Sequence, residues 1–80
     1  MDRIMLIGDS DIIYNSVMKV MFKEGMNLVY VTKDPLDAIV KCKEYYPDII
    51  IYEHSTNCSN LTLFIKQLKE YNSEIRMVFL

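Results

Sequence analysis

Short apolar runs alternate with longer amphipathic stretches along the whole chain. Four runs rich in Ile, Val, Leu and Met predict β-strands at 3–7, 28–32, 48–53 and 75–80. Between them, apolar residues recur at helical spacing and predict α-helices at 12–24, between Asp34 and Pro47, and at 60–71. The order βαβαβαβ with short connections indicates an α/β fold with a parallel sheet and right-handed crossovers.

The run from Asp48 to Glu53 is the centre of this pattern. It holds three consecutive isoleucines, Pro47 precedes it, and a carboxylate closes it. A short run of this kind is typical of a central strand that is buried on both faces. Ligands of open parallel sheets bind beyond the carboxyl ends of the strands, so we expect any chemical site near Glu53.

Each predicted helix has an apolar stripe and a candidate cap. The widest stripe belongs to the first helix and predicts that it is well buried; it consists of Ile12, Ile13, Val17, Val20, Met21 and Phe22. The second helix presents Leu36, Ile39 and Val40 on one face, with the stem of Lys43 at its edge. Gly25 is the expected end of the first helix, and the candidate N-caps are Ser10 or Asp11, Asp34 before Pro35, and Ser59 or Asn60.

Composition and charge describe a single globular domain over residues 1–80, with 51% hydrophobic and 25% charged residues. The 9 basic and 11 acidic side chains are spread along the chain, so we expect neither a nucleic-acid partner nor a membrane surface. Cys42 and Cys58 lack metal-ligand spacing and accompany one histidine, which argues against zinc. Isolated cysteines without an export signal indicate the cytoplasm.

On these residues the chain resembles the receiver domain of two-component response regulators. Ile4 to Asp9 is similar to the first strand running into the family's acidic pair, and Pro47 to Glu53 to the strand that ends in the phospho-accepting aspartate. Ile75 to Leu80 is similar to the fourth strand. The resemblance implies a three-layer flavodoxin-like fold, cut short after the fourth strand, with sheet order 2-1-3-4 and one partial domain.

The departures from the family's pattern affect its chemistry. Glu53 holds the acceptor position, and Gly8 replaces the first acid of the pair, leaving Asp9. Asn57 and Leu61 stand where the family has a proline and a glycine. The family's switch hydroxyl and lysine would follow Leu80. A longer acceptor and a weakened magnesium site, with Asp9 and Glu53 as its remaining ligands, imply that no cofactor is required and that phosphotransfer is lost.

Two functions follow from the resemblance. The first is a degenerate receiver-like signalling module, neither phosphorylated nor an enzyme, that acts by protein–protein binding or self-association. The alternative is a phospho-accepting receiver whose C-terminal part, with any DNA-binding output domain, lies outside this chain. A purely structural α/β fragment is a third reading, and a small phosphodonor with Mg²⁺ separates the first two.

The first loop also allows a hydrolase interpretation. Gly8-Asp9-Ser10 after a strand is similar to the first block of SGNH hydrolases, in which Ser10 would be the nucleophile. That chemistry requires a histidine base with an acidic orienter. The only histidine is His54, and no downstream Asp-x-x-His occurs, so we do not favour this reading.

The end of the chain predicts self-association. A fold cut short after its fourth strand leaves that strand as an open edge and leaves one sheet face bare around the third and fourth strands. We therefore expect a homodimer or larger assembly, with edge strands pairing antiparallel. The predicted edge surface consists of Ile75, Met77, Val78, Phe79 and Leu80.

Overall fold

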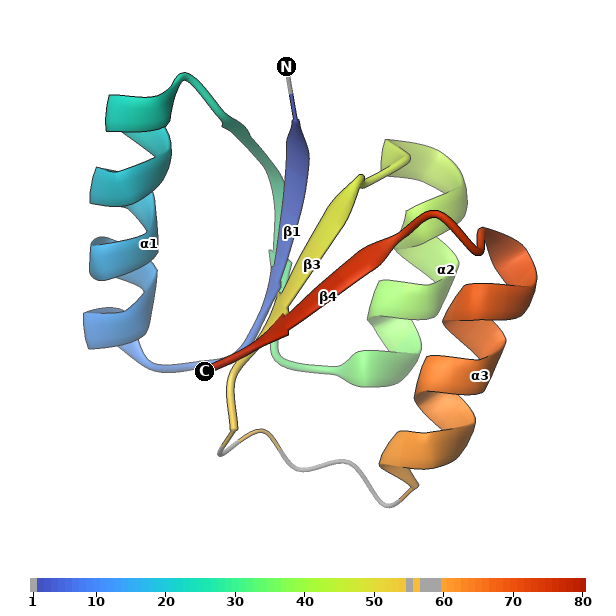
Figure 1. Ribbon diagram of the computed structural model, residues 1–80. Coiled ribbons are helices and arrows are strands. Elements are labelled where there is room, and N and C mark those ends of the chain that lie inside the picture. Colours follow the sequence, from blue (N-terminus) through green and yellow to red (C-terminus); the bar gives the residue numbers. More distant parts are fainter. Residues whose placement is uncertain (1, 55, 57–59) are drawn as a thin grey trace.

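The predicted order of elements is confirmed, and the strands form one parallel sheet. The computed structural model describes residues 2–54, 56 and 60–80. The sheet has the order β2-β1-β3-β4, built from β1 (Arg3–Ile7), β2 (Asn27–Thr32), β3 (Ile49–Tyr52) and β4 (Arg76–Phe79). Three helices connect the strands, α1 (Asp11–Glu24), α2 (Pro35–Tyr45) and α3 (Leu61–Tyr71). Figure 1 shows the three layers, with α1 on one face of the sheet and α2 and α3 on the other.

Strand β3 is central, as predicted, but only one of its faces is fully buried. It pairs in parallel with β1 and with β4, so that Ile51 lies between Leu6 and Val78. Ile50 and Tyr52 are buried, whereas Ile49 and Ile51 are only half-buried. The expectation of burial on both faces was wrong for the second face, because a single helix covers it.

The main core lies between the sheet and the pair α2 and α3. The Tyr71 hydroxyl donates a hydrogen bond to the Cys42 carbonyl oxygen at 3.0 Å and joins the two helices. Aromatic contact extends the core along β3, since the rings of Tyr52 and Phe64 lie 5.9 Å apart. The buried members of this cluster are Met5, Ile7, Ala38, Cys42, Ile50, Tyr52, Phe64, Leu68 and Ile75.

Helix α2 turns a different face to the sheet from the one predicted. Pro35, Ala38 and Cys42 are buried, whereas Leu36 and Val40 are exposed. Residues at i, i+3 and i+7 lie on one helix face, and small side chains there let the helix backbone approach the sheet closely. The prediction considered only the large apolar residues of α2, and Leu36 and Val40 among them lie on its solvent-exposed side.

Helix α1 is less buried than predicted. Only Val17 and Met21 are buried among its residues, and Phe22 is 90% exposed. The helix contacts its own sheet along one stripe, so a helix that is apolar on several sides keeps much of that surface outside. It is nevertheless too short and polar to cross a membrane, and so are the other helices that the structure describes.

Helix ends follow the local rules in most places. Ser10, Asp34 and Asn60 are the N-caps, and their side chains accept from backbone N–H groups of the first turns; Ser59 lies outside the described residues. Gly25 ends α1 with a φ of 71°. Tyr46 ends α2 with a φ of 51°. This is a left-handed backbone conformation that residues other than glycine and asparagine rarely adopt.

Candidate functional site

Glu53 lies where the carboxyl ends of β1 and β3 meet, as the sequence predicted. Ile7 pairs with Tyr52, and the next N–H, that of Glu53, donates to the Ile7 carbonyl oxygen at 2.8 Å. Glu53 is only 8% exposed, the one buried charged side chain among the described residues. The candidate site is therefore an interior carboxylate at the edge of the sheet.

The Glu53 carboxylate turns back onto the connection between β1 and α1. Its Oε2 accepts hydrogen bonds from the N–H of Asp9 at 2.9 Å and from the N–H of Ser10 at 3.2 Å. Both donors directly precede α1, whose N-terminal end carries partial positive charge. Charge-assisted bonds of this kind are stronger than neutral ones, so Glu53 ties β3 to the start of α1.

Gly8 makes this arrangement possible. A Cβ placed on Gly8 would lie 2.2 Å from Oε2 and 2.7 Å from Cβ of Glu53, both well inside van der Waals contact. The Gly8 backbone is fixed by its N–H, which donates to the Thr32 carbonyl oxygen at 2.8 Å. Sequence reasoning treated the changes at Gly8 and Glu53 as separate losses; no local pattern could reveal that the two residues share one space.

Backbone bonds join the residues after Glu53 to the end of β4. The His54 N–H donates to the Leu80 carbonyl oxygen at 2.6 Å, and the Leu80 N–H to the Tyr52 carbonyl oxygen at 2.9 Å. The N–H of Thr56 closes a turn onto the Glu53 carbonyl oxygen at 2.9 Å. Asn57 and Cys58, which the sequence analysis singled out, lie outside the described residues.

The predicted magnesium ligands make a poor metal site. Asp9 meets Glu53 through its backbone N–H, and Gly8 contributes no oxygen from a side chain. A hollow of about 260 Å³ adjoins this turn, and Asp9 and Asp11 line part of it. Within the part of the chain that the structure describes, no three His, Cys, Asp or Glu side chains gather as a metal site. These residues do not fit Mg²⁺ well, and weak binding stays a prediction.

Ser10 has a structural role that the sequence also suggested. Its Oγ accepts a hydrogen bond from the Ile13 N–H at 3.3 Å, as an N-cap does. His54 lies beyond β3 and is exposed. The positions of Ser10 and His54 give no support to the hydrolase hypothesis.

The groups with shifted pKa values lie among α2, β2 and α3. Burial raises the pKa of the Cys42 thiol to about 11, which keeps it protonated and unreactive. The Tyr30 hydroxyl donates to Asp37 Oδ2 at 2.7 Å, and this bond lowers the pKa of Asp37 and raises that of Tyr30. The bond from Tyr30 to Asp37 joins β2 to α2, and Cys42 lies in the main core.

The predicted edge surface divides between the two faces of the sheet. Ile75 does not belong to it: this residue is buried in the main core, and its carbonyl oxygen accepts from the Lys69 ammonium. Met77 is half-buried against the same core. The exposed members are Val78, Phe79 and Leu80. β4 is an edge strand of the sheet, as predicted.

No protein-family model and no curated protein matches the chain. Solved structures of response regulators do. The isolated REC domain of RcsB from Salmonella enterica serovar Typhimurium, with phosphomimetic BeF3−, has a TM-score of 0.79 at 16% identity, over 98% of this chain and 59% of that one. A CheX–CheY–BeF3−–Mg²⁺ complex from Borrelia burgdorferi matches with a TM-score of 0.79 at 18% identity, over 98% and 60%.

A LuxR-family two-component response regulator from Aurantimonas sp. SI85-9A1 matches with a TM-score of 0.81 at 19% identity, over 99% of this chain and 57% of that one. The solved structures that this chain resembles are therefore receiver domains, and it has their flavodoxin-like fold. It spans about three fifths of the length of these three chains.

Proposed function

We propose that this chain, which has the fold of a response-regulator receiver domain, is a signalling module that binds protein and does not accept phosphate at Glu53. One observation carries the proposal. The Glu53 carboxylate is buried over Gly8 and accepts the N–H groups of Asp9 and Ser10, so it serves as an internal anchor. It is not an enzyme under this proposal, and its cysteine usage suits the reducing cytoplasm.

The chemistry of aspartyl phosphorylation supports this view. A carboxylate nucleophile must attack phosphorus in line, while a metal and donors neutralise the phosphoryl oxygens. Glu53 is longer than aspartate by one methylene, and its Oε2 is directed at the turn before α1. A misplacement of about 1 Å can lower a rate ~100-fold. Gly8, in turn, contributes no carboxylate to a metal site.

The surface supports a protein-binding role. Large apolar side chains are exposed on α1 and at the end of β4, among them Ile12, Phe22 and Phe79. Apolar and aromatic side chains are favoured at the centres of protein interfaces. Signalling by this module would then depend on what covers these side chains, and not on a phosphoryl group.

The test is exposure of the chain to small phosphodonors. We expect no phosphoryl adduct by intact mass after acetyl phosphate with Mg²⁺, and no bound signal in ¹⁹F NMR with beryllofluoride. A receiver domain with an aspartate acceptor, treated in parallel, is the positive control. A phosphoryl group mapped to Glu53 would instead establish the phospho-accepting alternative.

A reconstructed site gives a matched comparison. The double variant Gly8→Asp with Glu53→Asp restores the acid pair and the shorter acceptor while leaving Asp9 in place. We expect it to bind Mg²⁺ more tightly than the wild type in isothermal titration calorimetry, because additional carboxylates meet at one point. Aspartate at position 53 keeps the Cβ that would lie 2.7 Å from a Cβ on residue 8, so far-UV circular dichroism must first show that the variant folds. Equal affinities in a folded variant would mean that Gly8 and Glu53 are not what weakens the metal site.

A further inference from the structure

The turn before α1 binds a carboxylate that the chain itself provides. Oε2 of Glu53 accepts the N–H of Asp9 at 2.9 Å and the N–H of Ser10 at 3.2 Å, and the side chain is only 8% exposed. Successive backbone N–H groups that converge on one oxygen form a concavity suited to anions. Here the concavity is occupied, so its affinity for a carboxylate is visible in the structure.

Gly8 leaves the space in which this carboxylate lies. A Cβ on Gly8 would lie 2.2 Å from Oε2 and 3.2 Å from Cδ of Glu53, so a side chain there would take the place of the carboxylate. The Gly8 N–H is bound to the Thr32 carbonyl oxygen, and the donors to the anion are those of Asp9 and Ser10. We call these two N–H groups, with the space over Gly8, the carboxylate site.

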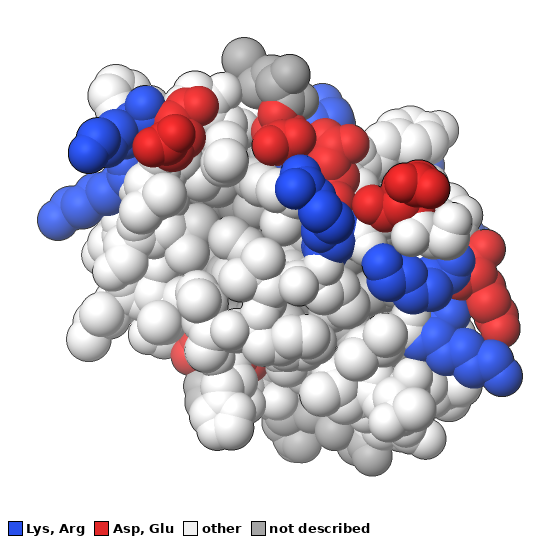
Figure 2. Space-filling model, viewed as in Figure 1, with Lys and Arg blue, Asp and Glu red and all other residues white. Residues whose placement is uncertain are grey.

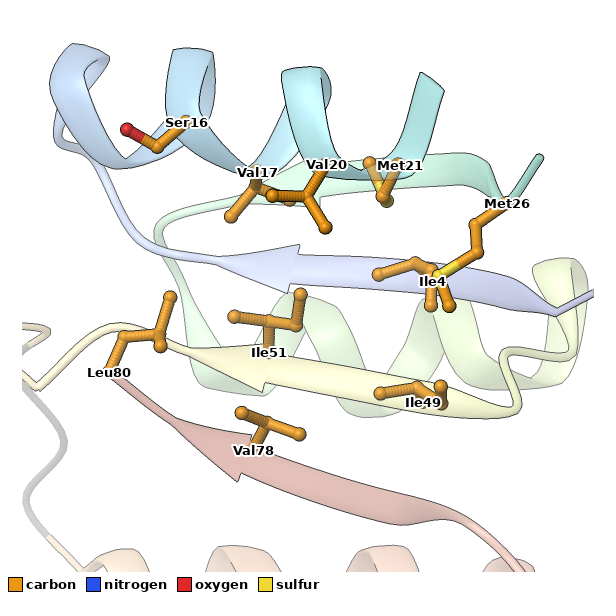
Figure 3. Close-up of a pocket in the computed structure, with 10 residues that line it drawn as sticks. All are labelled: Ile4, Ser16, Val17, Val20, Met21, Met26, Ile49, Ile51, Val78 and Leu80. Carbon is orange, nitrogen blue, oxygen red and sulfur yellow. The ribbon is translucent and has the colours of Figure 1, made fainter. Parts of the chain in front are cut away.

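The largest apolar hollow of the molecule shown in Figure 3 has a different chemistry. This slot of about 410 Å³ lies between α1 and the sheet, with Val17 and Val20 on the helix side and Val78 on the strand side. Its lining is apolar apart from Ser16. An anion there would give up its hydration for one hydrogen bond at most, which is costly. Of these two places, only the carboxylate site suits an anion.

The charge around the carboxylate site favours an anion with a single charge. Asp9 and Asp11 line the hollow beside the same turn. On the face shown in Figure 2, Lys and Arg side chains lie along the upper and right-hand parts, and none lies at the lower end, where β1 and β3 end in Figure 1. The attraction therefore comes from backbone N–H groups at the start of α1. Repulsion by the two aspartates grows with the charge of the ligand, which disfavours phosphate.

We propose that the carboxylate site is a binding site for small monocarboxylates that Glu53 keeps filled from within the chain. The substitution Glu53→Ala removes the side-chain atoms beyond Cβ, and acetate consists of the same heavy atoms in the same arrangement. Acetate therefore enters the site of this variant and accepts the same two N–H groups. In the native chain Glu53 is tethered beside the site, and a tethered ligand competes at a high effective concentration. External acetate does not displace it.

This inference deepens the proposed function and rests on it. A carboxylate that attacks phosphorus must leave the N–H groups of Asp9 and Ser10, whereas an internal ligand stays on them. The permanent occupant fixes the turn before α1 in one arrangement without any outside ligand. A protein partner would then meet a turn whose conformation does not depend on a phosphoryl group.

Urea unfolding in acetate tests the carboxylate site. At neutral pH and equal ionic strength, acetate in place of chloride should raise the urea midpoint of Glu53→Ala in a saturable way. An acetate concentration about ten times Kd should raise the ratio of folded to unfolded chains about tenfold. For a ligand of this size we expect a Kd on the order of millimolar.

Asp34→Ala is the matched control. Asp34 Oδ1 also accepts a backbone N–H before a helix, that of Leu36 at 3.0 Å, but in an exposed position. Its truncation leaves no enclosed space for a ligand. Acetate should therefore change the midpoints of Asp34→Ala and of the wild type only through its general effect as a salt.

Analogues of the ligand and of the side chain test the chemistry. Acetamide has the shape of acetate without its charge, and phosphate has more charge, so neither should stabilise Glu53→Ala as acetate does. Glu53→Gln keeps the site filled by a neutral side chain of the same shape and should gain nothing from acetate beyond the salt effect. Equal gains for Glu53→Gln and Glu53→Ala would place the acetate elsewhere and overturn the proposal.

Amide NMR shows where the acetate binds. Titration of Glu53→Ala should shift the ¹H–¹⁵N resonances of Asp9 and Ser10 with the Kd found by unfolding, and the wild type should show no such shifts. Equal stability of Glu53→Ala in acetate and chloride, including a variant unfolded in both, would overturn the proposal, as would shifts that leave these two amides unchanged. The phosphodonor experiment uses the wild type, so the two proposals fail separately.

Discussion

Gly8 and Glu53 occupy neighbouring space that only one of them can fill. A side chain on Gly8 would begin 2.2 Å from Oε2 of Glu53, the oxygen that accepts the N–H groups of Asp9 and Ser10. The glycine at position 8 and the glutamate at position 53 are therefore sterically complementary. The longer carboxylate is accommodated because glycine leaves room for it.

Gly8→Ala is expected to destabilise the chain through Glu53. Overpacking of this kind costs ~1–3 kcal/mol of unfolding free energy. The cost should be smaller when Glu53→Ala has already removed the nearer contact, although the contact with the Glu53 Cβ remains. Urea unfolding of the wild type, both single variants and the double variant measures this coupling. Costs that add within about 0.5 kcal/mol would show that the two residues do not interact.

Tyr46→Asn is expected to stabilise the chain by ~0.5–1 kcal/mol, because asparagine tolerates the left-handed conformation that ends α2. Tyr46 is largely exposed, so little packing is lost. The neighbouring Tyr45→Asn is the control and should destabilise instead, since Tyr45 stacks on Tyr30 with ring centroids 5.0 Å apart. Thermal unfolding distinguishes the two; a lower melting temperature for Tyr46→Asn would contradict this account.

The bond from Tyr30 to Asp37 predicts a pH-dependent stability. It lowers the pKa of Asp37 below its ordinary value of 3.8, so the stabilisation is present above that value and is lost as the pH falls through the folded-state pKa. The stability difference between wild type and Tyr30→Phe should therefore be larger at neutral pH than at about pH 3.

Tyr71→Phe is the control for this pH experiment. The Tyr71 hydroxyl donates to a backbone carbonyl oxygen, which does not titrate, so the effect of its loss should be the same at both pH values. Urea midpoints at the two pH values provide the measurement. Parallel behaviour of Tyr30→Phe and Tyr71→Phe would show that Asp37 carries no such stabilisation.

Cys42 is expected to react with thiol reagents only when the chain unfolds. It is completely buried, and burial raises its pKa to about 11, so almost no thiolate is present at neutral pH. A Cys58→Ser variant leaves Cys42 as the single thiol, and its labelling rate should rise with urea in step with the unfolded fraction. Rapid labelling of the folded protein would indicate that α2 opens locally.

Much of the fold follows from local residue patterns. Alternating apolar runs and helical stripes predicted seven elements in the correct order, and Asp34 and Gly25 were correctly placed at helix ends. The pattern around Glu53 located the candidate site at the end of the central strand. Such features depend on residues close together in the chain, so they can be predicted from the sequence.

Three features depended on contacts between distant residues. Small side chains decided which face of α2 packs, so Leu36 faces solvent and Ala38 the core. Ile75 is not part of the predicted edge surface, because it is buried in the main core with residues of α3. Gly8 and Glu53 come into contact only because β1 and β3 are adjacent in the sheet. Apolarity shows that a residue can be buried, but the space available among neighbouring elements determines which residues are buried, and that space exists only in the folded chain.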